Sequence, residues 1–330
     1  MNVTGRSVVV TGGAGFIGSH VVERLIAVGA DVTIVDDLSV GTRENVSDAE
    51  QKGAHLVVGD IRDSELMLEA LAGAAVVIHM ACDNLRASLG NPERTHDINA
   101  TGTLRTCLAA VENGVERFLY VSSSEAYGSA QTKPMDERHP LVPTTVYGAS
   151  KAAGELYAQS CMRRYGMAAT VVRPFNSYGP REHASGNSAE VIPKFVTRIR
   201  SGSPPVIFGD GSQTRDFTWV EETAVGIVSA AASDELVGDV VNLAHGEPVT
   251  ILEICNLLLE IIGADGLEPE FHDERPGDVA HHWADTTKAR ELLGFEARIP
   301  IREGLERYVQ WVAAQGNGRA EGEPQVVRNW

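Results

Sequence analysis

Two short polar stretches hold the residues best suited to chemistry. SSSEAYG (Ser122–Gly128) follows the apolar run ERFLYV, so three hydroxyls, a carboxylate and a tyrosine stand where a buried strand should end. Farther along, YGASK places Tyr147 and Lys151 four residues apart, which on a helix means one turn and one face. A free tyrosine has a pKa of about 10 and is a poor base at neutral pH, but a nearby ammonium favours the phenolate. Tyr147 is therefore predicted to act as a base whose pKa Lys151 lowers.

A glycine-rich stretch near the N-terminus predicts a dinucleotide site. TGGAGFIG places Gly12, Gly15 and Gly18 between the apolar run SVVVTG and an amphipathic helix, with Phe16 and Ile17 at the start of that helix. Glycines in this position let the backbone turn tightly and approach a pyrophosphate held at the helix N-terminus. The strand before the glycines and the helix after them supply the context that the pattern needs.

Two further strand ends refine the choice of cofactor. The second predicted strand, DVTIVD, ends at Asp36, where a carboxylate can bind a ribose hydroxyl and repel a 2′-phosphate. NAD is therefore favoured over NADP, although Arg43 lies nearby and could hold a phosphate. In GDIRD, Asp60 and Ile61 also follow a strand and are expected to grip the adenine.

Strand-like and helix-like segments alternate from the first residues, which predicts an α/β fold with a parallel sheet. Long helices are expected over 99–112 and 146–165. After residue 173 the sequence becomes rich in Gly, Pro, Ser and Asn. We therefore predict an NAD-binding domain over 1–173 with a returning segment near 217–243, a smaller second region over 174–216 and 244–315, and a peripheral tail over 316–330.

Composition excludes several classes of function. The chain has 330 residues, 43% of them hydrophobic, and a net charge of -17, which argues against nucleic acid or an anionic membrane as a partner. No membrane span and no signal peptide are expected. The four cysteines are far apart without metal-ligand spacing. A cytoplasmic protein without a metal is predicted, with His281 and His282 at the surface or in a substrate loop.

The ordered set of motifs resembles the extended short-chain dehydrogenase/reductases that modify nucleotide sugars. The stretches that carry the resemblance are TGGAGFIG, Asp36, GDIRD, NATGT at Asn99, SSSEAYG, YGASK, RPFNSYGPR, GDGSQTRDF and RPGD. The resemblance implies a Rossmann-like doubly wound parallel sheet with a smaller C-terminal substrate-binding region. It also implies bound NAD that is used catalytically, a nucleotide-sugar substrate with a UDP-sugar favoured, and a homodimer.

The resemblance also implies roles for individual residues. Tyr147 would remove the O4 proton while C4 passes its hydride to NAD, with Lys151 as electrostatic partner and ribose ligand and Ser123 bonded to O4. Asn99 would belong to the cofactor site. The nucleotide diphosphate would be bound by residues of three further motifs, namely Asn176 in RPFN, Arg215 in TRDF and Arg275 in RPGD. Guanidinium groups suit that task because they bind phosphate in a bidentate manner.

Glu125 and Ser124 bear on which reaction follows C4 oxidation. A C4-epimerase needs no further acid or base, and its counterpart of Glu125 is usually small or a hydroxyl residue. A carboxylate there is typical of relatives that act at C5 and C6, where it can abstract the acidic C5 proton. The commonest 4,6-dehydratases carry an aspartate in place of Ser124. Ser-Glu occurs in some 4,6-dehydratases of UDP-N-acetylhexosamines and in UDP-glucuronate decarboxylases.

Several alternatives stay open at this point. Arg86, in ACDNLRASLGNP, matches neither kind of relative closely and could serve a carboxylated sugar. An NDP-hexose 4,6-dehydratase is the favoured prediction, with a UDP-glucuronate decarboxylase or a UDP-sugar C4-epimerase as alternatives. A non-catalytic dinucleotide sensor on the same fold is less favoured, because Ser123, Tyr147 and Lys151 are all intact.

Overall fold

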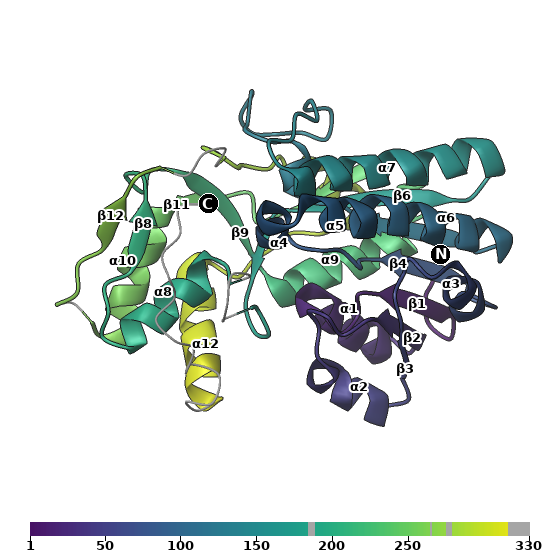
Figure 1. Cartoon of the computed structure of the whole chain (residues 1–330), viewed down its shortest axis with the longest axis horizontal. Coiled ribbons are helices and arrows are strands. Elements are labelled where there is room, and N and C mark those ends of the chain that lie inside the picture. The colour runs from purple at the N-terminus through teal and green to yellow at the C-terminus, as the bar shows by residue number, and fades with distance from the viewer. Residues whose placement is uncertain (184–188, 265, 275–278, 316–330) are drawn as a thin grey trace.

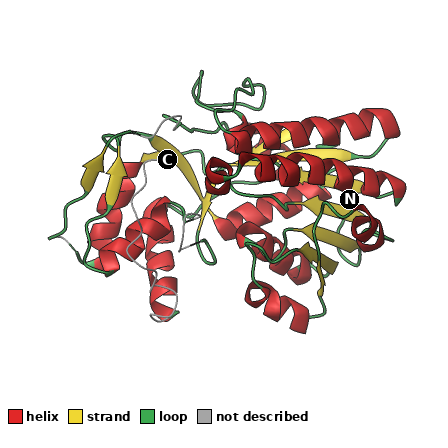
Figure 2. Ribbon diagram, viewed as in Figure 1, coloured by secondary structure: helices red, strands yellow, loops and turns green. Residues whose placement is uncertain are grey.

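The centre of the fold is a seven-stranded parallel sheet with helices on both faces (Figures 1 and 2). The computed structural model describes residues 1–183, 189–264, 266–274 and 279–315. The strand order is β10-β6-β5-β4-β1-β2-β3. The strands are β1 (Ser7–Thr11), β2 (Asp31–Asp36), β3 (His55–Val58), β4 (Val76–His79), β5 (Arg117–Val121), β6 (Ala169–Pro174) and β10 (Val240–Leu243). This is the Rossmann-like doubly wound sheet that the motifs predict, and its order reverses between β1 and β4, where such folds open a ligand crevice.

Two apolar cores cover the two faces of this sheet. One is formed with α1 (Phe16–Ala27), α2 (Ser47–Gln51), α9 (Val220–Ala232) and α11 (Thr287–Leu293). The other is formed with α3 (Ser64–Ala70), α6 (Thr103–Glu112) and α7 (Val146–Tyr165). The strands are apolar on both sides because both faces are buried, and each fully buried aliphatic side chain contributes about 2 kcal/mol.

The helix predicted over 146–165 is confirmed, and its ends are locally encoded. Thr145 caps the N-terminus of α7, accepting a hydrogen bond from the Gly148 amide at 3.1 Å. Gly166 ends the helix in the left-handed region at φ 77°, where glycine is favoured. The helix predicted over 99–112 begins instead with a π-helical turn, η2 (Asp97–Gly102), before α6.

A smaller lobe lies beside the sheet, on the left of Figure 1. Its apolar core is built from α8 (Val191–Arg200), α10 (Ile251–Ile262) and α12 (Ile301–Ala314). Two small sheets join it, one of β7 (Asn176–Tyr178), β9 (Thr214–Trp219) and β11 (Pro248–Thr250), the other of β8 (Val206–Phe208) and β12 (Glu270–His272). Short elements elsewhere are α4 (Leu85–Gly90), α5 (Pro92–His96), η1 (Arg43–Val46) and η3 (Ser124–Ala126).

The division of the chain between the two lobes differs in one place from the predicted boundaries. We expected 244–315 to belong to the smaller region, yet Ala289 of α11 and Phe295 are buried in the same core as β1 and α1. The segment around α11 therefore packs against the large sheet, although it follows elements of the smaller lobe in the sequence. Its apolar side chains cover β10, which would otherwise be an exposed edge. The tail predicted over 316–330 lies outside the described residues.

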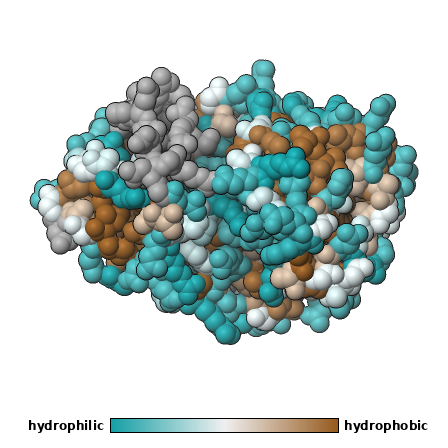
Figure 3. Space-filling view, turned by 90° about the horizontal axis from the view of Figure 1, so that it is seen from below, coloured by the Kyte–Doolittle hydropathy of each residue, from teal (hydrophilic) through white to brown (hydrophobic). Residues whose placement is uncertain are grey.

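The face in Figure 3 is mostly hydrophilic, with smaller apolar areas between the polar side chains. Over the residues that the structure describes, we find no helix with the length and apolarity needed to cross a bilayer.

Candidate active site

One large cavity lies where the strands of the main sheet end. Its volume is about 720 Å³, a size usual for small-molecule sites. Residues that follow β1, β4, β5 and β6 line it, and α8 and β9 of the smaller lobe complete the wall. The cavity brings together these residues singled out from the sequence: Gly12, Gly15, Phe16, Ile17, Gly18, Asp36, Asp60, Ile61, Arg86, Ser123, Ser124, Glu125, Tyr147, Lys151, Asn176 and Arg215. Asn99 does not line it, and Arg275 lies outside the described residues.

The glycine loop is shaped to let a ligand approach the backbone. Gly12 has φ 71°, and a Cβ on it would lie 2.7 Å from Cα of Ala81. Gly15 is the N-cap of α1 with no side-chain cap, so the first amides of the helix remain available to an anion. β1 and β4 are paired in parallel from Val8 and Val76 onward, which brings the loops after both strands to one level. These residues fit a dinucleotide pyrophosphate.

Asp36 stands at the end of β2 in the position expected for a ribose ligand. Its carboxylate accepts hydrogen bonds from the amides of Ala14 and Leu38, both at 2.9 Å, and burial raises its pKa. Arg43, which could have favoured NADP, is exposed and donates to Glu50 from Nε at 3.1 Å and from Nη2 at 2.8 Å. A guanidinium already paired in this bidentate way is a poor partner for a 2′-phosphate.

We expect protein purified under native conditions to carry NAD rather than NADP. Denaturation followed by chromatography of the released nucleotide identifies it. Arg43→Ala should leave the bound species unchanged, since Glu50 already neutralises that side chain, whereas Asp36→Ala should relax the preference. Release of NADP from the unmodified protein would show that Arg43 outweighs Asp36.

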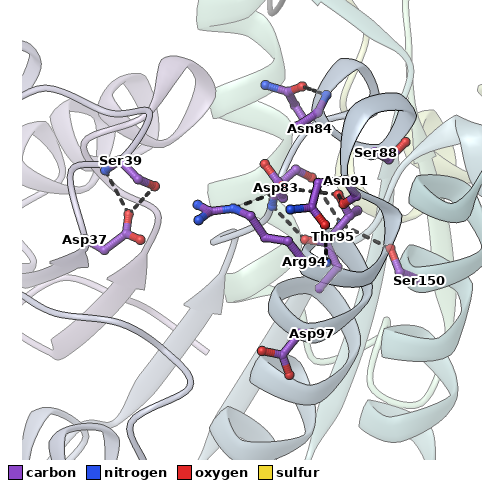
Figure 4. A network of polar contacts seen from close by, with 12 residues as sticks. Asp37, Ser39, Asp83, Asn84, Ser88, Asn91, Arg94, Thr95, Asp97 and Ser150 are labelled. Carbon is purple, nitrogen blue, oxygen red and sulfur yellow. Dashed lines mark hydrogen bonds and ion pairs between the residues drawn. The ribbon is translucent and has the colours of Figure 1, made fainter.

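Asn99 lies behind the cavity wall rather than in it. Its side-chain oxygen accepts from the Asp83 amide at 2.7 Å, and its nitrogen donates to the Asp83 carbonyl and to Ser150 Oγ, each at 3.1 Å. Thr95 and Arg94 hold the Asp83 carboxylate in the same network (Figure 4). Asn99 thus ties the chain after β4 to α7, and the cofactor role implied by the resemblance stays a prediction.

The residues predicted to grip the adenine lie at the other side of the crevice. Ile61 is buried. Asp60 accepts hydrogen bonds from the Arg62 guanidinium, the nearest at 2.6 Å, and Arg62 also pairs with Asp97 at 2.8 Å. The Arg62 guanidinium lowers the pKa of Asp60. Asp60 is therefore an anionic hydrogen-bond acceptor, and Arg62 fixes the orientation of its carboxylate. Adenine binding by Asp60 and Ile61 remains a prediction.

The three consecutive serines after β5 have three different partners. Ser122 donates to the buried carboxylate of Glu155, which also pairs with Arg173 at 2.6 Å, so Ser122 belongs to the scaffold. Ser123 caps η3 by accepting from the Glu125 amide at 3.2 Å, and its hydroxyl is hydrogen-bonded to that of Tyr147. Ser124 turns to His282. Ser123 is therefore the serine that the structure couples to the predicted base.

Tyr147 is half-buried at the cavity wall, and the environment of its phenol differs from the prediction. Burial raises the pKa of Tyr147 well above the usual range, and electrostatic interactions with Cys82, Glu125 and Glu190 raise it further. The hydrogen bond with Ser123 acts in the opposite direction and lowers this pKa. The expected lowering by Lys151 is not among the causes of this shift, and the positive nicotinamide ring, which is expected to favour the phenolate as well, belongs to the NAD-bound enzyme. The protein groups alone raise the pKa of Tyr147, because desolvation and nearby carboxylates both disfavour a phenolate.

Lys151 is directed at the end of β5. Its ammonium donates to the Val121 carbonyl at 2.7 Å and lies 4.7 Å from the centre of the Tyr120 ring. Burial lowers the pKa of Lys151. Its side chain lines the cavity, so the residue can present the remaining donors of its ammonium to a ribose there.

Ser124 occupies the position where many dehydratases carry an aspartic acid. Its Oγ lies 3.5 Å from Nδ1 of His282, whose Nε2 lies 3.3 Å from the Gly128 carbonyl. A carbonyl only accepts, so Nε2 carries the proton and Nδ1 accepts from Ser124. Burial lowers the pKa of His282 to about 3, which makes it neutral near neutral pH. The surface position expected for His282 is thus wrong, because its ring is fully buried against Phe175, whereas the alternative of a substrate loop stays a prediction.

The smaller lobe supplies polar groups for a substrate. Asn176 begins β7 and its buried Oδ1 has no hydrogen-bond partner among the described residues. Arg215 is placed by its neighbour Asp216, whose buried carboxylate accepts from the amides of His245 and Gly246, each at 3.1 Å. Arg215 and the amide of Asn176 face one cavity, as a diphosphate site requires.

Sequence reasoning missed several charged residues of the cavity, and four of them bear on the substrate. Glu182, Glu190, Lys194 and Arg198 all line the cavity. The last three recur every four residues, a spacing that places them on one face of a helix and could have identified them. Glu182 had no such signal. The preceding residue, Arg181, has a left-handed backbone at φ 69°. This conformation cannot be predicted from the sequence for a residue other than glycine.

Arg215→Ala is expected to weaken nucleotide binding by roughly 10- to 100-fold, the usual cost of losing hydrogen bonds to a charged group. Titration calorimetry with UDP and dTDP measures the change. Arg302→Ala is the matched control, since Arg302 pairs on the surface with Glu260 at 2.8 Å. Unchanged affinity for both nucleotides in Arg215→Ala would remove this residue from the diphosphate site.

A glycine loop at the N-terminus of α1, an acidic residue ending β2 and a Ser-Tyr-Lys set beside them define an NAD-dependent dehydrogenase/reductase of the short-chain type. Over residues 8–244 the chain matches the profile of the NAD dependent epimerase/dehydratase family. It is 35% identical over 306 residues to the UDP-glucose 4-epimerase of Mycolicibacterium smegmatis, covering 92% of this chain and 97% of that relative.

Solved structures agree with that match. The UDP-glucose 4-epimerase of Thermotoga maritima, with UDP-glucose, has a TM-score of 0.88 and 35% identity over 94% of this chain and 99% of that one. The dTDP-glucose 4,6-dehydratase of Streptomyces venezuelae, with NAD bound, has a TM-score of 0.89 and 32% identity over 94% and 98%. The chain therefore belongs to the NAD dependent epimerase/dehydratase family, and it is an NAD-dependent enzyme of nucleotide-sugar metabolism.

Proposed function

We propose that this enzyme is an NDP-hexose 4,6-dehydratase, with a UDP-hexose as the favoured substrate. The observation that carries the proposal is the carboxylate of Glu125. It lines the cavity together with Ser123 and Tyr147, and its charge is near enough to raise the pKa of the Tyr147 phenol. A carboxylate in the same cavity as the proposed C4 base supports a role at the neighbouring carbon of the sugar.

The first step uses Tyr147 and Ser123. Tyr147 takes the proton of the O4 hydroxyl, and Ser123, hydrogen-bonded to Tyr147, holds O4 in line with it. When bound, NAD supplies the hydride acceptor for C4, a positive charge beside the phenol and, at the end, the hydride for C6. Lys151 orients the ribose from one helical turn beyond the base.

The second step uses Glu125. Once C4 is a ketone, the C5 proton is acidic because it is α to a carbonyl, and the Glu125 carboxylate abstracts it. The C6–O bond then breaks and the hydroxyl leaves as water if a proton is supplied to it. Returning the proton to C5 as C6 is reduced gives a 4-keto-6-deoxy sugar, with no net change in oxidation state.

The proton for the leaving hydroxyl has a second candidate source besides Ser124. Ser124 faces Nδ1 of a neutral histidine, the ring nitrogen that carries no proton to pass on. Glu182 is buried and lines the same cavity. Burial, with the charge of Glu190, raises the pKa of Glu182 well above its usual value, which favours the protonated form that a general acid needs. We assign the acid role to Glu182.

Glu182→Gln should slow water loss by roughly 10²–10⁴-fold, the usual contribution of a general acid, while C5 exchange with solvent continues. Mass spectrometry of the sugar in heavy water follows both events. Glu137→Gln is the matched control, because its carboxylate is also partly buried but bonds to the Asn242 amide at 2.9 Å. Equal loss of exchange and dehydration in Glu182→Gln would assign this residue to an earlier step.

A UDP-sugar C4-epimerase is the second candidate. Ser124 favours it, because a hydroxyl held by His282 is no acid and an epimerase needs none. The similarity to the UDP-glucose 4-epimerases of Mycolicibacterium smegmatis and Thermotoga maritima supports the same candidate. Ser123 and Tyr147 would perform this reaction without Glu125.

Incubation with UDP-, dTDP-, GDP- and CDP-hexoses, and with UDP-glucuronate, separates the candidates by product mass. Loss of water from a hexose supports the dehydratase. An unchanged mass with inversion at C4, seen by NMR, indicates the epimerase. Loss of carbon dioxide from UDP-glucuronate would instead establish the decarboxylase that the Ser-Glu pair leaves open.

A further inference from the structure

An arginine and a glutamate from the two lobes meet at the cavity. Arg86 lies on α4 beside the main sheet, and Glu190 immediately precedes α8 in the smaller lobe. Nη2 of Arg86 is 3.8 Å from Oε2 of Glu190. Both side chains line the cavity, so the pair spans the space between the lobes.

The pairing leaves Arg86 partly unsatisfied. Its side chain is 16% exposed, and its buried Nε has no hydrogen-bond partner among the residues that the structure describes. A distance of 3.8 Å permits charge attraction but no short bidentate contact. Arg86 can therefore donate to a neutral acceptor, such as a sugar hydroxyl, while Glu190 offsets its charge.

The same glutamate acts on the groups around the base. The negative charges of Glu190 and Glu125 both raise the pKa of the Tyr147 phenol. Glu190 also raises the pKa of Glu182 and opposes the lowering of the pKa of His183 by burial. Two carboxylates thus act on the predicted base, and one of the cations that line the cavity, Arg86, is paired with one of them.

We propose that Glu190 is a specificity-determining residue, which cancels the charge of Arg86 and selects nucleotide sugars with a neutral hexose over those with a uronate. This inference takes from the proposed function only that the sugar lies beside Tyr147. A carboxylate on the sugar would stand near the carboxylates of Glu125 and Glu190, and like charges repel even where solvent partly screens them, as at Glu190, whose side chain is 42% exposed. Arg86, the residue that first suggested a carboxylated sugar, would offer it no uncompensated charge.

Binding rather than turnover tests the proposal. In the Tyr147→Phe background, where no chemistry interferes, titration calorimetry compares UDP-glucose with UDP-glucuronate, with UDP alone as the baseline. We expect UDP-glucose to bind roughly 10- to 100-fold more tightly than UDP-glucuronate. One repulsive contact between like charges at a partly exposed site is enough for a difference of this size. Adding Glu190→Gln should recover most of that difference for UDP-glucuronate and leave UDP-glucose nearly unchanged.

Two matched variants show whether the effect comes from charge. Glu190→Asp keeps the carboxylate and should keep the selectivity. Adding Arg86→Gln to Glu190→Gln should abolish the gain for UDP-glucuronate, because the uncovered guanidinium provides it. UDP-glucose binding no tighter than UDP-glucuronate in the background protein, or a difference that Glu190→Gln leaves unaltered, would overturn the proposal. Neither result depends on whether the unmodified enzyme dehydrates or epimerises, which the product masses report separately.

Discussion

Tyr147→Phe is expected to reduce turnover by roughly 10²–10⁴-fold while the protein still folds and binds nucleotide sugar. The variant lacks only the oxygen that accepts the O4 proton, and removing a positioned base costs about 10²–10⁴-fold. The ring still fills its half-buried site at the start of α7. Absorbance of reduced nicotinamide in a single turnover measures C4 oxidation, and calorimetry with the substrate measures binding.

Tyr165→Phe provides the control, since Tyr165 ends the same helix and is 54% exposed. It should behave as the unmodified enzyme does. Because the pKa of Tyr147 is raised and its deprotonated form is the base, oxidation in the unmodified enzyme should become faster as pH rises. Near-normal oxidation in Tyr147→Phe would remove the proposed first step.

Glu125→Gln is expected to stop the reaction after C4 oxidation. The amide has the size of the carboxylate but cannot take the C5 proton, whereas Ser123, Tyr147 and Lys151 remain. Bound NAD should still become reduced and then stay reduced. Removing the negative charge also lowers the pKa of Tyr147, so the oxidation step should reach its maximum at lower pH than in the unmodified enzyme.

Heavy water separates the possible roles of Glu125. A dehydratase places solvent deuterium at C5 of its product, and the Glu125→Gln variant should place none, a loss of roughly 10²-fold or more in exchange rate. Glu190→Gln is the matched control, since it removes a second charge near Tyr147 but should leave C5 exchange intact. Turnover without C5 exchange that is insensitive to Glu125→Gln would contradict the dehydratase and leave epimerisation as the better account.

The parts of the site that could be predicted from the sequence are those set by local geometry. Gly12, Gly15 and Gly18 act within one turn between a strand and a helix. Tyr147 and Lys151 share a face because a helix repeats every 3.6 residues. Asp36 ends a strand whose apolar run is visible in the sequence. Each depends on residues a few positions apart, so the pattern alone was sufficient.

Only the tertiary structure decided what each group meets across the cavity. His282 is 158 positions from Ser124, yet it accepts a hydrogen bond from the Ser124 hydroxyl. Arg86 pairs with Glu190 only because the two lobes line the same cavity. Asn99, which matches a cofactor motif, is turned by the π-helical start of its helix toward Asp83. Burial and distant carboxylates, rather than the neighbouring lysine, set the direction of the Tyr147 pKa shift. Desolvation and long-range charge depend on which surfaces pack together, and hydrophobic periodicity encodes that a face is buried without encoding which partner buries it.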